Sequence, residues 1–110
     1  MAKSPVSQGK KPTPSWTAIL KALADETRLE IVGSLLKQEA SVQALSDTLK
    51  IKVYNISKHL KILEETGLVE KKKDGALRVY SISAKLRSHF SENHVLDLGC
   101  CKFIFNGTEK

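Results

Sequence analysis

The chain has 110 residues and carries a formal net charge of +6 at pH 7. This length fits a single domain, and no apolar run approaches the length of a membrane-spanning helix. The two cysteines, Cys100 and Cys101, are adjacent, and neighbouring cysteines rarely bridge each other because the geometry is strained. The composition therefore excludes a disulfide scaffold, and we expect a cytoplasmic location.

The chain divides into an arm, one domain and a short tail. Residues 1–14 are rich in Ser, Lys, Gly, Gln and Pro and lack the apolar region of a secretory signal. We expect a disordered basic arm there, a folded domain over residues 15–106, and a tail over residues 107–110.

The positive charge is concentrated in one stretch. Residues 50–80 hold eight basic and four acidic side chains. A localised basic surface suggests a polyanion such as a nucleic acid as partner. The alternative is a lysine-rich surface that only aids solubility.

Four successive segments show the apolar spacing of helices. Asp25 and Ser41 are placed to cap the second and third helices, and Gly67 is placed to end the fourth in a left-handed conformation. A tight turn at Lys50 and Ile51 joins the third helix to the fourth. The predicted helices cover residues 16–24, 26–38, 42–49 and 52–66.

The second half of the chain predicts a β-hairpin. Residues 68–72 and 77–82 alternate and are rich in β-formers, with the hairpin signal Asp74-Gly75 between them. We expect a last helix, capped by Ser83, to run through residue 90 and on to residue 98, with a short terminal strand within residues 100–106. This order is that of a mainly α, α+β winged helix-turn-helix fold, in which the second helix of the motif enters the major groove.

The fourth helix separates into two faces when each residue advances by about 100°. Ile56, Leu60 and Leu63 mark the core side with Val53 beside them, whereas Ile62 falls on the opposite, polar side. That polar face carries side chains suited to reading base edges and phosphates, with flanking groups beside it. The candidate DNA-binding residues on this helix are Lys52, Tyr54, Asn55, Ser57, Lys58, His59 and Lys61.

The hairpin adds a second basic cluster. We predict that four side chains contact phosphates on either side of a minor groove: Lys71, Lys72, Lys73 and Arg78. The competing interpretation is the solvated face of an ordinary amphipathic helix, but a basic helix joined to a basic hairpin is the less common pattern.

Three segments resemble the ArsR-type repressors in the expected order. Residues 23–29 (LADETRL) resemble the family's "LADPTRL" entry to the second helix, and residues 55–69 (NISKHLKILEETGLV) its recognition helix. Asp74-Gly75 followed by Arg78-Val79-Tyr80 resembles the wing. The resemblance covers over half of the chain, residues 23–82.

The resemblance implies a homodimeric repressor of double-stranded DNA operators whose DNA affinity falls when an effector binds. The effector is often a thiophilic metal ion and sometimes an oxidant or sulfur species. Dimers of the family are built mainly from the first and last helices, which here points to Trp16, Ile19, Leu20, Leu23, Leu86, Phe90, Val95 and Leu96.

The sensor sites of the family are not matched. No thiol occurs in residues 39–42, where the family's Cys-x-Cys box would fall, and His89, His94 and Asp97 lack the spacing of its second site. Lys52 also stands where a Ser cap is frequent. We therefore predict no resident metal or cofactor, with a soft metal ion or thiol-reactive effector kept as an alternative.

Cys100 and Cys101 admit two interpretations. Two thiolates per subunit would suit a soft-metal or redox sensor. Alternatively, Cys101 alternates with Phe103 and Phe105 and packs as an apolar residue. The second interpretation is preferred because free cysteines are among the most buried residues.

Other classes of protein fit less well. The sequence has no Gly-rich phosphate loop and no nucleophile elbow, so we expect no enzyme. A winged-helix protein-interaction module would keep the fold but lack the basic face. A DNA-binding protein without an effector is the third alternative.

Overall fold

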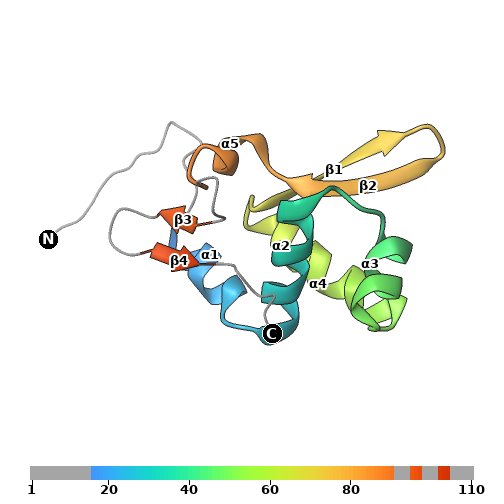
Figure 1. Cartoon of the computed structure of the whole chain (residues 1–110), viewed down its shortest axis with the longest axis horizontal. Helices are drawn as coiled ribbons and strands as arrows, with labels where there is room; N and C mark the ends of the chain where they lie inside the picture. Colours follow the sequence, from blue (N-terminus) through green and yellow to red (C-terminus); the bar gives the residue numbers. More distant parts are fainter. Residues whose placement is uncertain (1–15, 91–94, 98–101, 105–110) are drawn as a thin grey trace, which may run out of the picture.

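In the computed structural model, residues 16–90, 95–97 and 102–104 are described. Four helices come first, then a hairpin, a short helix and a second hairpin (Figure 1). None of the helices in these ranges is long and apolar enough to cross a membrane. The elements are α1 (Trp16–Leu23), α2 (Glu26–Lys37), α3 (Val42–Leu49), α4 (Val53–Glu65), β1 (Val69–Asp74), β2 (Leu77–Ile82), α5 (Ala84–Arg87), β3 (Val95–Asp97) and β4 (Lys102–Ile104).

The predicted starts of α2 and α3 are confirmed by their caps, whereas Ser83, predicted to cap the last helix, precedes α5 without a side-chain capping bond. Asp25 Oδ1 accepts the backbone N–H of Arg28 at 3.0 Å, and Ser41 Oγ accepts that of Ala44 at 3.1 Å. These side chains satisfy N–H groups that the first turn leaves without partners. Gly67 ends α4 with a φ of +84°, as predicted.

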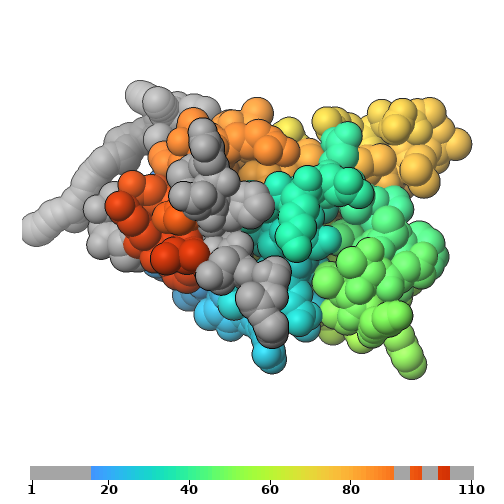
Figure 2. All heavy atoms as spheres, viewed as in Figure 1, coloured from blue at the N-terminus to red at the C-terminus, as the bar shows by residue number. Residues whose placement is uncertain are grey.

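The hairpin of β1 and β2 is longer than predicted. The two strands pair antiparallel from Val69 with Ile82 to Asp74 with Leu77, so only Gly75 and Ala76 form the turn. Gly75 has a φ of +70°, which suits the first central position of a type II′ turn. Figure 2 shows this hairpin at the end of the molecule that is opposite β3 and β4.

The segment between α2 and α3 joins the hairpin at its base. The N–H of Ala40 donates to the Tyr80 carbonyl at 3.0 Å, and the N–H of Tyr80 donates back at 2.8 Å. This bridge fixes the start of α3 relative to β2 and hence the hairpin relative to the helices.

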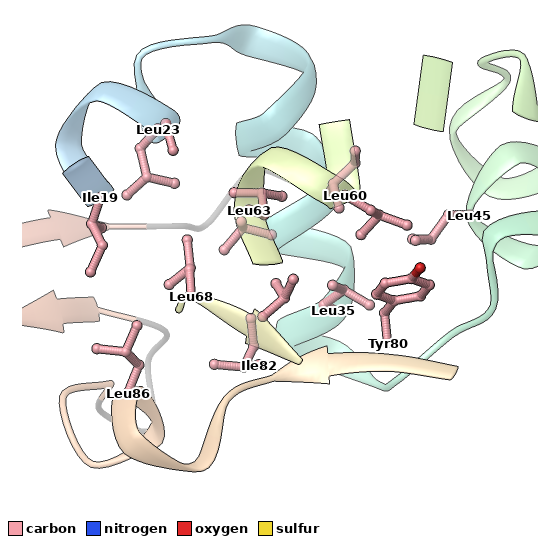
Figure 3. Close-up of a cluster of buried hydrophobic side chains, with 14 of the residues drawn as sticks. Ile19, Leu23, Leu35, Leu45, Leu60, Leu63, Leu68, Tyr80, Ile82 and Leu86 are labelled. Atoms are coloured by element: carbon pink, nitrogen blue, oxygen red, sulfur yellow. The ribbon is translucent and has the colours of Figure 1, made fainter. Parts of the chain in front are cut away.

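The core lies between the helices and the base of this hairpin (Figure 3). Leu60 and Leu63 of α4 are fully buried, as are Leu35 of α2 and Leu45 of α3. Burying such side chains supplies about 1.5–3 kcal/mol each, which holds α4 on its apolar side. Other buried apolar residues include Ile19, Leu23, Ile31, Val32, Ile56, Leu68, Ile82, Leu86 and Leu96.

The prediction of a long last helix is wrong. α5 ends at Arg87, Phe90 forms a β-bridge with Leu96, and β3 pairs antiparallel with β4. The sequence at residues 91–94 is Ser-Glu-Asn-His, in which three of four residues are weak helix formers. Leu96 opposite Phe103 anchors this second hairpin, because Leu96 is fully buried and Phe103 packs against the core. The predicted terminal strand is confirmed for Lys102–Ile104.

Candidate nucleic-acid interface

The helix α4 presents one apolar and one polar face. Ile56 is fully buried together with Leu60 and Leu63, as predicted. Ile62, which falls on the polar side of the helical wheel, is half-buried and packs against the core. Val53 differs from the prediction: it is 41% exposed, because it begins the helix and has no preceding turn beneath it.

The polar face of α4 is open to solvent. Tyr54 is 73% exposed, and Lys52, Asn55, Ser57, Lys58 and Lys61 are also exposed. The Nζ atom of Lys58 lies 5.8 Å from the centre of the Tyr54 ring, one turn away on the helix. Such a cation–π contact limits the freedom of both side chains and holds a positive charge at the middle of the face.

The turn between α3 and α4 fixes how this face is presented. Lys50 adopts a left-handed conformation with a φ of +61°, and its N–H donates to the Ser46 carbonyl at 2.8 Å. The Ser46 hydroxyl donates to the carbonyl of Ile51. The two helices are thus joined by a short hydrogen-bonded turn, the arrangement of a helix-turn-helix motif.

The wing, defined here as β1, β2 and their turn, carries its charges on two different faces. Residues directly opposite each other in a hairpin point to the same side, and successive residues alternate. Lys71 pairs with Tyr80 and Lys73 pairs with Arg78, so these side chains share the face that packs on the core at the base of the wing. The Nζ atom of Lys71 lies 5.9 Å from the centre of the Tyr80 ring.

Lys72 belongs to the other face of the wing. Its neighbours on that face of β1 are Glu70 and Asp74, and its Nζ atom is 3.1 Å from Glu39 Oε1. The four wing cations predicted as one cluster are therefore divided into three on one face and one ion-paired on the other. The alternation of side chains along the strands could have predicted the division of these cations between two faces. No sequence pattern could have predicted the ion pair between Lys72 and Glu39.

Arg28 of α2 makes contacts that were not predicted from the sequence. Its Nε donates to the Ala22 carbonyl at 2.6 Å, and its Nη1 lies 3.0 Å from His59 Nδ1 on α4. Nη1 is also 3.9 Å from Asp25 Oδ2. Arg28 thus joins the end of α1, the cap of α2 and α4, while His59 is only half-buried.

The pKa of Asp25 is lowered from its ordinary value of 3.8. The largest cause is the hydrogen bond from the backbone N–H of Arg28, which stabilises the carboxylate, and the charge of Arg28 acts in the same direction. Burial opposes these effects without reversing them. The cap is therefore a carboxylate at neutral pH, as an N-terminal helix dipole favours.

The eight residues predicted at a dimer interface fall into two sets. Ile19, Leu23, Leu86 and Leu96 are buried within the single chain. The other four are half-buried: Trp16, Leu20 and Phe90, which pack against the core, and Val95. Trp16 meets the ring of His89 edge-on, with centroids 5.0 Å apart.

The remaining candidates cannot be placed. Cys100, Cys101 and His94, the arm at residues 1–14 and the tail at residues 107–110 lie outside the described residues. Within the described ranges, no group of three or more His, Cys, Asp or Glu side chains is arranged to hold a metal ion.

Comparison with known proteins places this arrangement among transcription regulators. The family model described as bacterial regulatory protein, arsR family, matches residues 25–71, which run from the cap of α2 into the wing. The Vibrio cholerae protein named transcriptional activator HlyU is 39% identical over 66 residues, which cover 60% of this chain and 61% of HlyU. The matched region thus spans about three-fifths of that relative's length.

Solved structures and a longer sequence match agree. Reduced HlyU from Vibrio cholerae superimposes with a TM-score of 0.59 at 38% identity, covering 63% of this chain and 73% of that chain. A homodimeric winged helix-turn-helix DNA-binding domain from Mycobacterium bovis gives a TM-score of 0.61 at 30% identity, covering 64% and 65%. The arsenical resistance operon repressor of Staphylococcus xylosus is 29% identical over 96 residues, covering 83% of this chain and 92% of the repressor.

The family model matches the stretch from the cap of α2 to the first half of β1, and a solved relative shares both sequence and fold over most of its length. The chain belongs to the arsR family of bacterial regulatory proteins and has its winged helix-turn-helix fold.

Proposed function

We propose that the chain is a sequence-specific regulator of transcription that binds double-stranded DNA through α4 and the wing. The observation that carries this proposal is the exposed face of α4, with Tyr54, Asn55, Lys58 and Lys61 opposite a fully buried apolar stripe. An amide of this kind pairs with an adenine edge, and the lysines meet guanine or phosphate. Lys52 and Ser57, beside this face, supply further phosphate contacts.

We propose that only one face of the wing binds phosphates. Lys71, Lys73 and Arg78 share that face, and all three are exposed. Lys72 contributes little to DNA binding in this proposal, because its charge is offset by Glu39 and flanked by two acidic residues on its own face.

The active form proposed is a homodimer that binds a palindromic operator. Support comes from the half-buried apolar side chains of Trp16, Leu20, Phe90 and Val95, and from the homodimeric relative in Mycobacterium bovis. Two-fold symmetry of the protein is matched by symmetry of the operator. Buried residues such as Ile19 then support this interface from beneath.

Repression released by an effector is the mode we propose. In this mode the bound dimer blocks transcription at the operator, and an effector lowers the affinity of the dimer for DNA. One relative carries the name of a repressor, whereas HlyU carries that of an activator. Cys100 and Cys101 stay the sole thiol candidates for sensing, with packing as their preferred role. We keep the cytoplasm as the proposed compartment, residues 1–14 as an arm and residues 15–106 as the domain.

Selection of duplexes from a random pool by the reduced, metal-free protein tests the proposal. We expect an enriched palindrome and an affinity that falls steeply with salt. In the variant Lys73→Ala, the slope of log affinity against log salt should fall by about one unit. Lys72→Ala is the matched control on the same strand and should leave the slope almost unchanged.

Failure takes two forms in this experiment. No enrichment of any duplex would favour a protein-interaction module over a DNA-binding regulator. An equal loss of slope in both lysine variants would refute the division of the wing into two faces while leaving DNA binding intact.

A further inference from the structure

The contact between Arg28 and His59 fixes more than the packing of two helices. Arg28 Nη1 lies 3.0 Å from His59 Nδ1, and the two residues are 31 positions apart in the chain. The guanidinium is held in place from its other side by the Ala22 carbonyl, 2.6 Å from Nε. The Arg28 side chain is only 15% exposed, so it has little freedom to turn away.

Arg28 determines which ring nitrogen of His59 carries the proton. A guanidinium has five N–H donors, has no acceptor and does not lose its proton in proteins. A nitrogen at hydrogen-bond distance from it must therefore offer a lone pair. Nδ1 is then the acceptor, and the neutral ring carries its proton on Nε2.

The doubly protonated form of His59 does not fit this geometry. It would direct a second N–H from Nδ1 at Arg28 Nη1, with two like charges 3.0 Å apart. Asp25 lies nearby, but its Oδ2 atom is 3.9 Å from Arg28 Nη1 and its Oδ1 atom already accepts the Arg28 backbone N–H. Among the described residues no hydrogen bond joins Asp25 to His59, so an N–H on Nδ1 would face Arg28 Nη1 and have no acceptor.

Resting on the function proposed above, we propose that His59 is an uncharged phosphate-binding residue and that Arg28 is the positioning residue that sets its tautomer. With Nδ1 on Arg28, Nε2–H is the distal donor of a half-exposed ring. No hydrogen bond to Nε2 occurs among the described residues.

The position of His59 on α4 suits a phosphate rather than a base. It follows Asn55 by one turn and lies about 40° further round the helix, toward the core side and away from the middle of the exposed face. A side chain at that edge meets the backbone that borders a groove when the exposed face enters it.

The tautomer itself is tested without DNA. Long-range proton–nitrogen correlation NMR of the imidazole in the free protein at neutral pH should show an unprotonated Nδ1 and a protonated Nε2. Arg28→Lys keeps the positive charge but lacks the planar guanidinium that bonds to both Ala22 and His59. In this variant we expect His59 to populate a mixture of the two tautomers. A protonated Nδ1 in the wild-type protein would overturn the assignment.

The phosphate contact is tested with two neutral substitutions on the selected duplex. His59→Asn keeps an acceptor for Arg28, but its amide N–H is too close to the backbone to replace Nε2–H, whereas His59→Gln places an amide N–H further out. We expect His59→Asn to bind about ten- to a hundredfold more weakly, the range for a hydrogen bond to a charged group, and His59→Gln to recover most of that loss. Both should keep the salt slope of the wild-type protein, because an uncharged donor releases no counterion.

Two results would overturn the phosphate contact: a salt slope reduced by about one unit in both variants, which indicates a cationic His59, or equal affinities in both variants and the wild-type protein. Thermal melting of each variant checks that it is folded. Absence of any selected duplex would refute the proposed regulator as a whole, while the NMR result decides the role of Arg28 separately.

Discussion

At the scale of single residues, a few side chains determine where the helices begin and how they meet. Asp25 begins α2 by accepting the N–H of Arg28, and the side chain of Arg28 then reaches α1 and α4. The cap was predictable because its signal is local: an Asp precedes an apolar helical stripe. The link to His59 was not predictable, because no periodicity connects two residues in separate helices.

Loss of the Asp25 cap should lower stability in a way that depends on pH. Asp25→Ala removes the acceptor for the Arg28 N–H and should reduce the free energy of unfolding by about 1 kcal/mol near neutral pH. The pKa of Asp25 is lowered in the folded protein, so its contribution is complete above its ordinary value of 3.8 and is lost as pH falls through the folded value.

Chemical unfolding of three proteins at several pH values measures the effect. The difference between wild type and Asp25→Ala should shrink on acidification. Asp25→Asn keeps a capping oxygen without the charge and should be closer to wild type at neutral pH. A difference that grows on acidification would contradict a carboxylate stabilised by folding.

If α4 reads bases, substitutions on its exposed face should weaken binding to the preferred duplex more than binding to random DNA. Asn55→Ala and Lys58→Ala should each cost about 1–3 kcal/mol on the preferred duplex and little on random DNA, because base-edge contacts are lost. Titrations of both duplexes at one salt concentration measure the difference. Equal losses on both duplexes would assign these residues to positioning rather than to reading.

At the scale of elements, the regular helices and the wing followed from local patterns. Apolar spacing, caps and the Asp74-Gly75 signal predicted α1 to α4 and the β1–β2 hairpin within two residues at their ends. The strand β4 was predicted, but β3 and its pairing with β4 were missed because β3 has only three residues and depends on the burial of Leu96 in the core. A strand of that length has no periodicity to measure.

Two glycines with open space around them should respond to alanine in opposite directions. A Cβ atom at Gly75 or at Gly33 would meet nothing within 4 Å, so only the backbone conformation differs. Gly75 has a φ of +70°, where alanine costs about 1–2 kcal/mol. Gly33 lies inside α2, where alanine gains about 0.5–1 kcal/mol.

Unfolding by denaturant compares the two variants directly. Gly75→Ala should unfold at a lower denaturant concentration and bind DNA more weakly, since Lys73 and Arg78 flank the turn. Gly33→Ala should unfold at a higher concentration with DNA binding unchanged. Stabilisation by alanine at both positions would mean that the turn does not require a positive φ at residue 75.

At the scale of the whole molecule, the chain buries four of its eight predicted interface residues on its own. Ile19, Leu23, Leu86 and Leu96 belong to the core of the single chain, and half-buried Trp16 and Leu20 of α1 lie at its edge. The expected pairing of two long last helices is replaced by a short α5 and the β3–β4 hairpin. A dimer would therefore have less helical surface than the sequence predicted, and we expect α1 to be its main support.

Disruption of α1 should therefore produce a folded monomer with a distinctive DNA-binding defect. Leu20→Glu places a charge in the half-buried stripe and should shift sedimentation at micromolar concentration from dimer to monomer, because an unpaired charge is costly in an apolar interface. The matched control is Thr17→Glu, an exposed position on the same helix, which should remain dimeric. On a palindromic duplex, Leu20→Glu should bind far more weakly than wild type, whereas on a single half-site the two should differ little, since each half-site is read by one subunit. Monomeric wild-type protein, or a Leu20→Glu dimer with full palindrome affinity, would show that α1 is not the interface.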